Sequence, residues 1–245
     1  MKFGFTNRML SILFPPRCAI CDELLEKDAP IFCEQCEMIY LAATHAPCTA
    51  CGQRFSRCNC STEKLRDFHV KKLFKLFRYV RDEKDEAEHS TNHIIHLMKE
   101  KRDVLCRDFL AQELAASIRR SLPDAFENPD YVLTFAPRSR SRKLEYGFDQ
   151  SQYLGKRIAK LLSIRSSATL IRQKSAGVQK KKERDARFEN MKAAYSVKRN
   201  LSLRGKRVFL VDDVTTTGAS LGNAAKQLYK AGAQEVIGVT VAFCE

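Results

Sequence analysis

The fold class is decided by the stretch Val208-Phe209-Leu210-Val211-Asp212-Asp213-Val214-Thr215-Thr216-Thr217-Gly218-Ala219-Ser220. Its first four apolar residues predict a short buried strand, and residues 219–231 predict a helix that Gly232 ends. Two carboxylates therefore stand at the end of a strand, and a hydroxyl-rich turn leads into a helix N-terminus. Free N–H groups at a helix N-terminus bind phosphate, and paired carboxylates accept hydrogen bonds from vicinal sugar hydroxyls. The unit predicts a sugar-phosphate site, and it lacks the Gly-Lys-Ser/Thr ending of a Walker A loop.

Strand-like and helix-like segments alternate along the chain on both sides of this unit. The predicted strands cover residues 73–80, 131–136, 168–171, 208–211 and 236–243. The predicted helices cover residues 94–98, 104–119, 149–162 and 219–231. This alternation is typical of an α/β fold with a mainly parallel sheet and helices on both faces.

Two of the predicted helices carry further signals. The buried face of helix 104–119 is expected to hold Leu105, Phe109, Leu110, Leu114 and Ile118. Helix 149–162 is expected to have Asp149 as its N-cap.

A second strand end carries basic residues. Arg138 and Arg142 follow the predicted strand 131–136. Ligands of parallel α/β sheets bind beyond the carboxyl ends of the strands. We therefore expect Arg138, and with it Arg142, at the same edge of the sheet as the acid pair.

Eight of the ten cysteines lie close to the N-terminus. They form the pairs Cys18/Cys21, Cys33/Cys36, Cys48/Cys51 and Cys58/Cys60. Pairs at this spacing present thiolates in the way that four-sulfur zinc sites require. Zinc binding would supply folding free energy to a segment with few apolar residues. The sequence predicts about two structural zinc ions in a double zinc ribbon over residues 15–62, followed by a second domain over residues 63–245.

Alternatives to this arrangement stay open on the sequence. Disulfides need an oxidising compartment, and the chain shows no export signal. The paired spacing does not suit a ferredoxin-type cluster. Sequential and crossed pairing of the cysteines both remain compatible with the spacing. Cys58-Asn59-Cys60 is one residue shorter than a standard knuckle, so the second site is the less certain one.

The charge is unevenly distributed along the 245 residues. The chain has 43 Lys+Arg and 29 Asp+Glu, a net charge of +14, and residues 138–207 alone hold 21 basic and 5 acidic residues, a net charge of +16. Such a segment suggests a polyanionic partner. The sequence holds no stretch near the ~18 apolar residues that cross a bilayer. We expect a cytoplasmic protein without membrane insertion.

These features together resemble the ComF family. A cysteine-rich double zinc ribbon precedes the acid-pair unit, which resembles the phosphoribosyl pyrophosphate (PRPP) motif of type I phosphoribosyltransferases. Tyr146-Gly147-Phe148-Asp149-Gln150 and the segment with Gln179, Arg187, Asn190 and Ala194-Tyr195 match weaker family motifs. The resemblance spans residues 18–241. In the family's strand-end motif, a usual histidine is replaced by Ser139.

The resemblance implies a role for each part of the motif. The acid pair, Asp212 and Asp213, would bind the ribose hydroxyls, and Mg²⁺ would accompany the pyrophosphate. Arg138 would bind the pyrophosphate itself. The 5′-phosphate would lie in the loop formed by Thr215, Thr216, Thr217, Gly218, Ala219 and Ser220.

ComF proteins assist natural transformation, so the resemblance also implies a cytoplasmic factor that binds PRPP and internalised single-stranded DNA. The DNA-binding residues would be Arg142, Lys180, Lys181, Lys182, Arg184 and Arg187. Phe148, Tyr153, Phe188 and Tyr195 are candidates for stacking on bases and equally for the core. A DNA-uptake helicase or a processing protein is an implied partner.

Two alternatives remain on the sequence. One is an active phosphoribosyltransferase that moves ribose 5-phosphate from PRPP to an unknown acceptor, with residues 174–190 closing over the site. The other is a PRPP-sensing regulator of duplex DNA, which ranks last because no helix-turn-helix signature precedes the domain. Whether the protein catalyses transfer stays open at this stage.

Overall fold

The computed structural model describes residues 15–25, 31–79, 86–99, 104–173, 194–199 and 201–244. Its helices and 3₁₀ turns are α2 Glu34–His45, η1 Phe55–Arg57, α3 Glu63–Asp67, α4 Glu86–Lys99, α5 Val104–Ser121, η2 Pro123–Phe126, α6 Arg140–Tyr146, α7 Gln150–Leu162 and α9 Ala219–Lys230. Its strands are β1 Leu73–Phe74, β2 Phe77–Arg78, β3 Tyr131–Phe135, β4 Arg165–Ser166, β5 Leu170–Arg172, β6 Tyr195–Val197, β7 Arg207–Val211, β8 Val214–Thr215, β9 Glu235–Val239 and β10 Ala242–Phe243.

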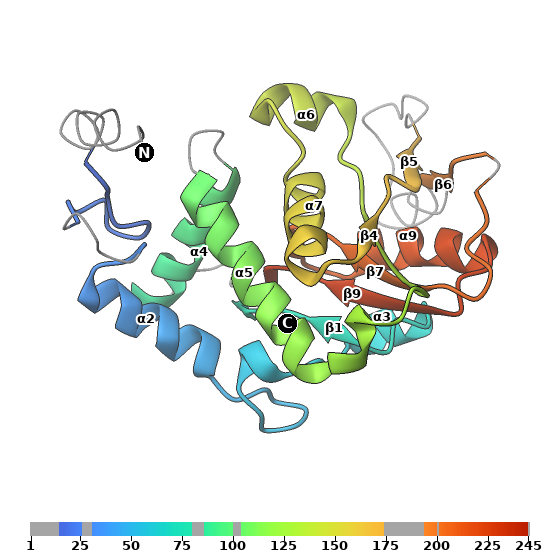
Figure 1. The fold of residues 1–245 in the computed structure, drawn as a ribbon. Helices are drawn as coiled ribbons and strands as arrows, with labels where there is room; N and C mark the ends of the chain where they lie inside the picture. The colour runs from blue at the N-terminus through green and yellow to red at the C-terminus, as the bar shows by residue number, and fades with distance from the viewer. Residues whose placement is uncertain are drawn as a thin grey trace, which may run out of the picture.

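The central sheet has five strands in the order β1-β9-β7-β3-β4, and every neighbouring pair is parallel. Helices α5 and α7 cover one face and α9 covers the other (Figure 1). A smaller parallel sheet, β2-β10-β8, and an antiparallel pair, β5-β6, complete the described strands. The predicted α/β class with a parallel sheet and flanking helices is confirmed.

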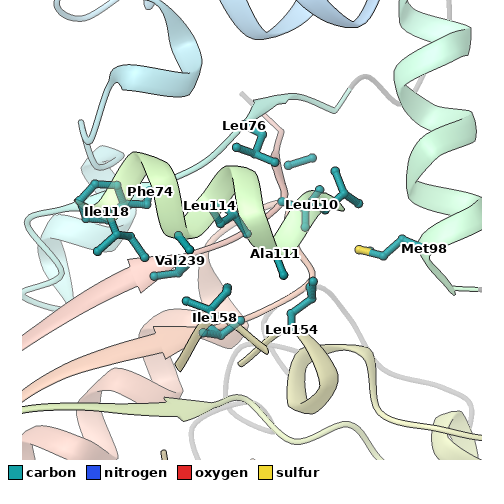
Figure 2. Close-up of a cluster of buried hydrophobic side chains, with 14 of the residues drawn as sticks. Phe74, Leu76, Met98, Leu110, Ala111, Leu114, Ile118, Leu154, Ile158 and Val239 are labelled. Atoms are coloured by element: carbon teal, nitrogen blue, oxygen red, sulfur yellow. The ribbon is translucent and has the colours of Figure 1, made fainter. Parts of the chain in front are cut away.

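The strands are buried on both faces because their alternate residues enter two different cores. In β7, Phe209 and Val211 pack with the α5 and α7 side, whereas Val208 and Leu210 pack with the α9 side. After Arg207, every residue of β7 is apolar and buried, which is the pattern expected for a parallel sheet covered on both faces. Figure 2 shows the first of these cores, where side chains of α4, α5 and α7 meet Phe74 and Val239 of the sheet.

Two predicted strands are each broken into two. The segment 73–80 forms β1 and β2, and the segment 236–243 forms β9 and β10. The breaks coincide because the segments are partners: β1 pairs with β9 in the large sheet, and β2 pairs with β10 in the small one. At the break, the Thr240 hydroxyl donates to the backbone oxygens of Asp213 and Ala242. The predicted continuous strands are therefore wrong in length but right in position.

Helix α5 differs from its predicted buried face at one position. Leu110, Leu114 and Ile118 are fully buried, but the Leu105 side chain is 71% exposed. Cys106 takes the buried position instead, since it lies four residues before Leu110 on the same helix face. The short helix predicted at residues 94–98 is the last part of the 14-residue α4.

The cysteine-rich segment contains a helix that the sequence analysis missed. Helix α2 begins directly after Cys33 and carries Cys36 in its first turn. Its Tyr40 and the preceding Phe32 pack edge-on against Phe109 of α5, with ring centroids 5.3 and 5.2 Å away. The segment is thereby joined to the same core as the central sheet.

Candidate functional site

The site begins at a point where the sheet topology changes direction. The chain leaves β3 through α6 and α7 to the edge strand β4, whereas it leaves β7 through α9 to β9 on the other side. Strands β3 and β7 are neighbours, so the segments that follow them diverge at their carboxyl ends. Such a switch point is where open α/β sheets bind ligands. It brings together Arg138, which follows β3, and the acid pair, which follows β7.

The two carboxylates of the acid pair have different surroundings. Asp212 is buried, and its Oδ1 accepts hydrogen bonds from the Ser151 hydroxyl at 3.1 Å and from the Asp213 backbone N–H at 3.0 Å. Burial raises the pKa of Asp212 well above its usual range, and the neighbouring Asp213 charge raises it further. Asp213 instead forms an ion pair with the Arg138 guanidinium. The Asp213 carboxylate and the Arg138 guanidinium therefore face each other across the switch point.

Asp149 holds the loop that carries Arg138. It caps α7 as predicted, since its Oδ1 accepts from the Gln152 N–H at 3.1 Å. Its Oδ2 accepts from the Arg138 backbone N–H at 3.1 Å and lies 2.9 Å from Lys143 Nζ. The Arg138 guanidinium also lies over the Tyr146 ring, 5.3 Å from its centroid. One buried carboxylate therefore fixes both the helix start and the candidate arginine.

The loop from Thr215 to Ser220 leads into α9 as the sequence predicted. Gly218 is the residue before the helix, and its φ of +73° is a left-handed conformation that favours glycine. The Thr217 hydroxyl accepts from the Ala219 N–H at 3.4 Å. The buried Thr215 hydroxyl has no hydrogen-bond partner within the described residues. A helix N-terminus with hydroxyl groups beside it is suited to an anion.

The structure adds residues that the sequence analysis did not select. Ser151 bonds to Asp212, and Lys99, at the end of α4, lies within electrostatic reach of the site. Burial lowers the pKa of Lys99, and the charge of Asp213 acts in the opposite direction. Neither residue had a signal in the sequence, because only the packing of α4 and α7 beside the switch point places them there.

The remaining basic candidates are either exposed on α6 or lie outside the part of the chain that the structure describes. Arg142 is exposed on α6, where it lies 3.5 Å from Glu145. Helix α6 has no buried residue and projects away from the sheet (Figure 1). The candidates Lys180, Lys181, Lys182, Arg184, Arg187 and Phe188, and the segment 174–190 expected to close over the site, lie outside the described residues.

Three of the four aromatic candidates for base stacking make contacts within the protein. The Arg107 guanidinium lies 4.5 Å from the centroid of the Phe148 ring and 4.9 Å from that of Tyr153. The Tyr153 hydroxyl donates to Asp108 at 2.7 Å. Tyr195 is buried. Tyr195 thus belongs to the packed interior, whereas Phe148 and Tyr153 are half-buried rings that lie against Arg107.

The eight N-terminal cysteines form two groups of four, in the sequential arrangement. In each of the groups Cys18/Cys21/Cys33/Cys36 and Cys48/Cys51/Cys58/Cys60, all Sγ atoms lie within 4.8 Å of one another. The Sγ separations of 3.7 Å between Cys21 and Cys33 and of 3.6 Å between Cys51 and Cys58 fit the about 3.8 Å edge of a tetrahedral zinc site with 2.3 Å Zn–S bonds. Both groups can hold zinc.

In each group, the pKa of the first cysteine is lowered, which favours its thiolate form. Burial alone would raise the pKa of Cys18, but backbone N–H donors, with that of Cys21 foremost, lower it to about 7. The pKa of Cys48 is lowered to about 7 in the same way, by the Ala50 N–H against its burial. Thiolates are the form that binds zinc.

The second group has a buried lysine beside it. Lys75 is 3% exposed, and its Nζ donates to Cys58 Sγ at 3.5 Å and to the Cys60 backbone oxygen at 2.8 Å. The same ammonium lies 5.0 Å from the centroid of the Phe55 ring. With zinc bound to this group, the Lys75 ammonium would offset part of the net negative charge of four thiolates around one divalent ion. Its bond to the Cys60 backbone oxygen holds the shortened Cys58-x-Cys60 turn.

We expect Lys75→Met to weaken zinc binding at the second group only. Loss of a residue that bonds to a metal ligand commonly costs about 10- to 100-fold in metal affinity. Titration with a colorimetric chelator should show one of two zinc ions released at an at least about tenfold lower chelator concentration. Lys72→Met is the matched control, because Lys72 is more exposed and pairs with Glu235. Equal release of both ions in the variant and the wild type would contradict the assignment.

Comparison with known proteins agrees with this geometry. Residues 151–243 match the model of the phosphoribosyl transferase domain family. The fold is an α/β domain with a parallel sheet, part of which matches this family, and the two four-cysteine groups that precede it fit a double zinc ribbon.

Among solved structures, the chain is similar to a purine phosphoribosyltransferase from Pyrococcus horikoshii Ot3, at 17% identity over 56% of this chain and 81% of that chain, with a TM-score of 0.33. None of the curated proteins compared with the chain matches it. Within its described part, no helix has the length and apolar character needed to cross a membrane.

Proposed function

We propose that this protein binds PRPP at the switch point between β3 and β7. The observation that carries the proposal is the acid pair at the end of β7, followed by a hydroxyl-rich turn and the N-terminus of α9, inside the segment that matches the phosphoribosyl transferase domain. Carboxylates suit the ribose hydroxyls, and the helix N-terminus suits the 5′-phosphate. One ligand with a diol and a phosphate satisfies both halves of the site.

The basic residues at the same edge suit the pyrophosphate. Arg138 lies across from Asp213, and Lys99 adds a second cation nearby. In the proposed complex, the ribose hydroxyls bind to Asp213 and the pyrophosphate binds to Arg138. Contacts with the ligand thereby replace the ion pair between Asp213 and Arg138. Mg²⁺ accompanying PRPP would neutralise part of the pyrophosphate charge, and the oxygen atoms of the acid pair are ligands that Mg²⁺ prefers.

The proposal extends to single-stranded DNA in natural transformation, in line with the resemblance to the ComF family. Its support is the basic segment 138–207, which includes the exposed Arg140 and Arg142 of α6. Because Phe148 and Tyr153 enclose Arg107, we expect contacts with the phosphate backbone rather than stacking on these rings. Such binding depends on salt and little on sequence.

Replacing Arg140 and Arg142 together by glutamine should weaken DNA binding and make it less sensitive to salt. Each phosphate contact to a single strand contributes about 0.7 to the slope of log affinity against log salt, so two lost contacts lower the slope by about 1.4. A fluorescent single-stranded oligonucleotide, titrated at several salt concentrations with and without Mg²⁺–PRPP, measures both quantities. Lys226 and Lys230, which are exposed on α9 and lie outside the basic segment, control for general loss of charge when they are replaced together by glutamine.

The outcomes separate the candidate functions. Binding that Mg²⁺–PRPP changes would support a DNA factor controlled by a sugar phosphate. An unchanged slope in the α6 variant would remove α6 from the DNA surface. Absence of oligonucleotide binding at about 0.15 M salt would contradict the DNA role. An active phosphoribosyltransferase would then be the function to test, by following pyrophosphate release from PRPP with candidate acceptors.

A further inference from the structure

Two side chains of the small β5-β6 sheet form a series of hydrogen bonds that ends in the loop of residues 215–220. Arg172 of β5 and Tyr195 of β6 are directly opposite each other in the antiparallel register. Arg172 Nη1 donates to the Tyr195 hydroxyl at 2.9 Å, and its guanidinium lies 5.3 Å from the centroid of the tyrosine ring. The Tyr195 hydroxyl is 2.7 Å from the Ser220 hydroxyl, in the first turn of α9.

The chemistry of the three groups allows an arrangement in which Ser220 donates a hydrogen bond into the loop. An arginine side chain only donates, so the Tyr195 oxygen accepts from Arg172. Either of the Tyr195 and Ser220 hydroxyls can donate to the other, and the single hydrogen of Tyr195 can be donated to the Ser220 oxygen. Burial raises the pKa of Tyr195, which keeps that hydrogen in place. When Tyr195 donates, the hydrogen of the Ser220 hydroxyl is left for another acceptor, such as a phosphate oxygen.

A hydroxyl fixed in this way is a donor toward the loop. Within the described residues, Ser220 makes no other side-chain hydrogen bond. In the same loop, the buried Thr215 hydroxyl also has no partner in the described part of the chain. Residues 215–220 contain no basic side chain, so Arg172, acting through Tyr195, brings a positive charge to this end of the site.

We propose that Arg172 and Tyr195 are positioning residues that orient the Ser220 hydroxyl as a donor to a phosphate monoester. The inference rests on the proposed PRPP site and deepens it, because it names two residues outside the loop that position one of its phosphate donors. Arg172 strengthens the donor by polarising the chain of hydrogen bonds. A group that only accepts hydrogen bonds is the ligand that such a chain prefers.

Tyr195→Phe is the direct test, since it removes one oxygen atom and keeps the ring. Calorimetric affinities for ribose 5-phosphate, Mg²⁺–PRPP and Mg²⁺–pyrophosphate should be compared with those of the wild type. We expect about tenfold weaker binding of the first two ligands, the loss typical of one charge-assisted hydrogen bond. Binding of pyrophosphate should be unchanged. Arg172→Met should give a smaller loss for the same two ligands.

A matched control lies at the amino end of β3, at the opposite end of the strands from the site. Tyr131 accepts a hydrogen bond from Arg207 at 3.1 Å, with the guanidinium 5.4 Å from the centroid of its ring. Tyr131→Phe removes the same kind of bond at the start of β3, away from the site, and should leave all three affinities unchanged. Thermal unfolding of both variants checks that their folded states are comparable.

The possible failures are distinguishable. Affinities of Tyr195→Phe within about twofold of the wild type would overturn the inference and leave the proposed function standing. An equal loss for all three ligands would also overturn it, because a general distortion of the site would then explain the result. A wild-type protein that binds neither ribose 5-phosphate nor Mg²⁺–PRPP would overturn the proposed function itself, and the inference with it.

Discussion

Replacing Asp212 and Asp213 together by asparagine should reduce the affinity for Mg²⁺–PRPP by at least about 100-fold. The reason is that asparagine carries no negative charge and presents an NH₂ donor in place of one acceptor oxygen at each of the two positions. Hydrogen bonds to charged groups contribute about 1.5–3 kcal/mol each, and 1.4 kcal/mol corresponds to a factor of ten in affinity. Isothermal calorimetry of the wild type and the double variant measures the effect.

The fold should survive this double substitution. An asparagine at position 212 keeps a carbonyl oxygen that can accept from Ser151 and from the backbone N–H of residue 213, as Asp212 does. It also removes a carboxylate whose raised pKa reports unfavourable burial of charge. Asparagine at position 213 leaves Arg138 without its ion-pair partner. The net change in stability should therefore be small compared with the loss of PRPP affinity.

A matched control for lost acidic charge lies at the other edge of the sheet. Asp130 is exposed and pairs with Lys206 at 2.8 Å. Asp130→Asn should leave PRPP affinity unchanged. If the double variant bound PRPP as tightly as the wild type, the assignment of the acid pair to the ribose would be wrong. If it no longer unfolded cooperatively, Asp213→Asn alone would be the informative variant, because it leaves the buried Asp212 intact.

Removing zinc should lower the melting temperature of the whole protein, and not only unfold its N-terminal segment. Phe32, Tyr40 and Phe55 of the cysteine-rich segment are nearly fully buried in the two cores that also hold the sheet. The Ser117 hydroxyl of α5 donates to the Ser56 backbone oxygen at 2.7 Å. Structural zinc contributes about 10–16 kcal/mol in small zinc-binding folds. If a third of this free energy, about 3–5 kcal/mol, stabilises the two cores, the melting temperature should fall by about 7–20 °C.

The measurement is a thermal unfolding scan after dialysis against a strong chelator, with zinc counted by metal analysis before and after. We expect about two zinc ions per chain from the two four-cysteine groups. Restoring zinc should restore the melting temperature, which separates metal loss from irreversible damage. An unchanged transition in the metal-free protein would mean that the cores do not depend on the cysteine-rich segment. A count of one would remove the Cys58-x-Cys60 group as a site.

The sequence alone was sufficient wherever the signal was local. The acid-pair unit before α9, the cap of α7 by Asp149 and the spacing of the cysteine pairs all involve residues a few positions apart. Helical and strand periods, caps and metal-ligand spacing are short-range rules. For the same reason, the lengths of the strands were wrong: the breaks near residues 75 and 240 depend on a partner strand far away in the chain.

The tertiary structure decided everything that needs two distant segments to meet. Arg138 pairs with Asp213 because β3 lies beside β7, although 75 positions separate the two residues. Lys75 reaches the second cysteine group, and Arg107 fills the space between Phe148 and Tyr153. Tyr195, which the sequence left between core and DNA surface, is joined by its hydroxyl to Ser220. Strand order and side-chain partners depend on the free energy of packing the whole chain, which no short stretch of sequence contains.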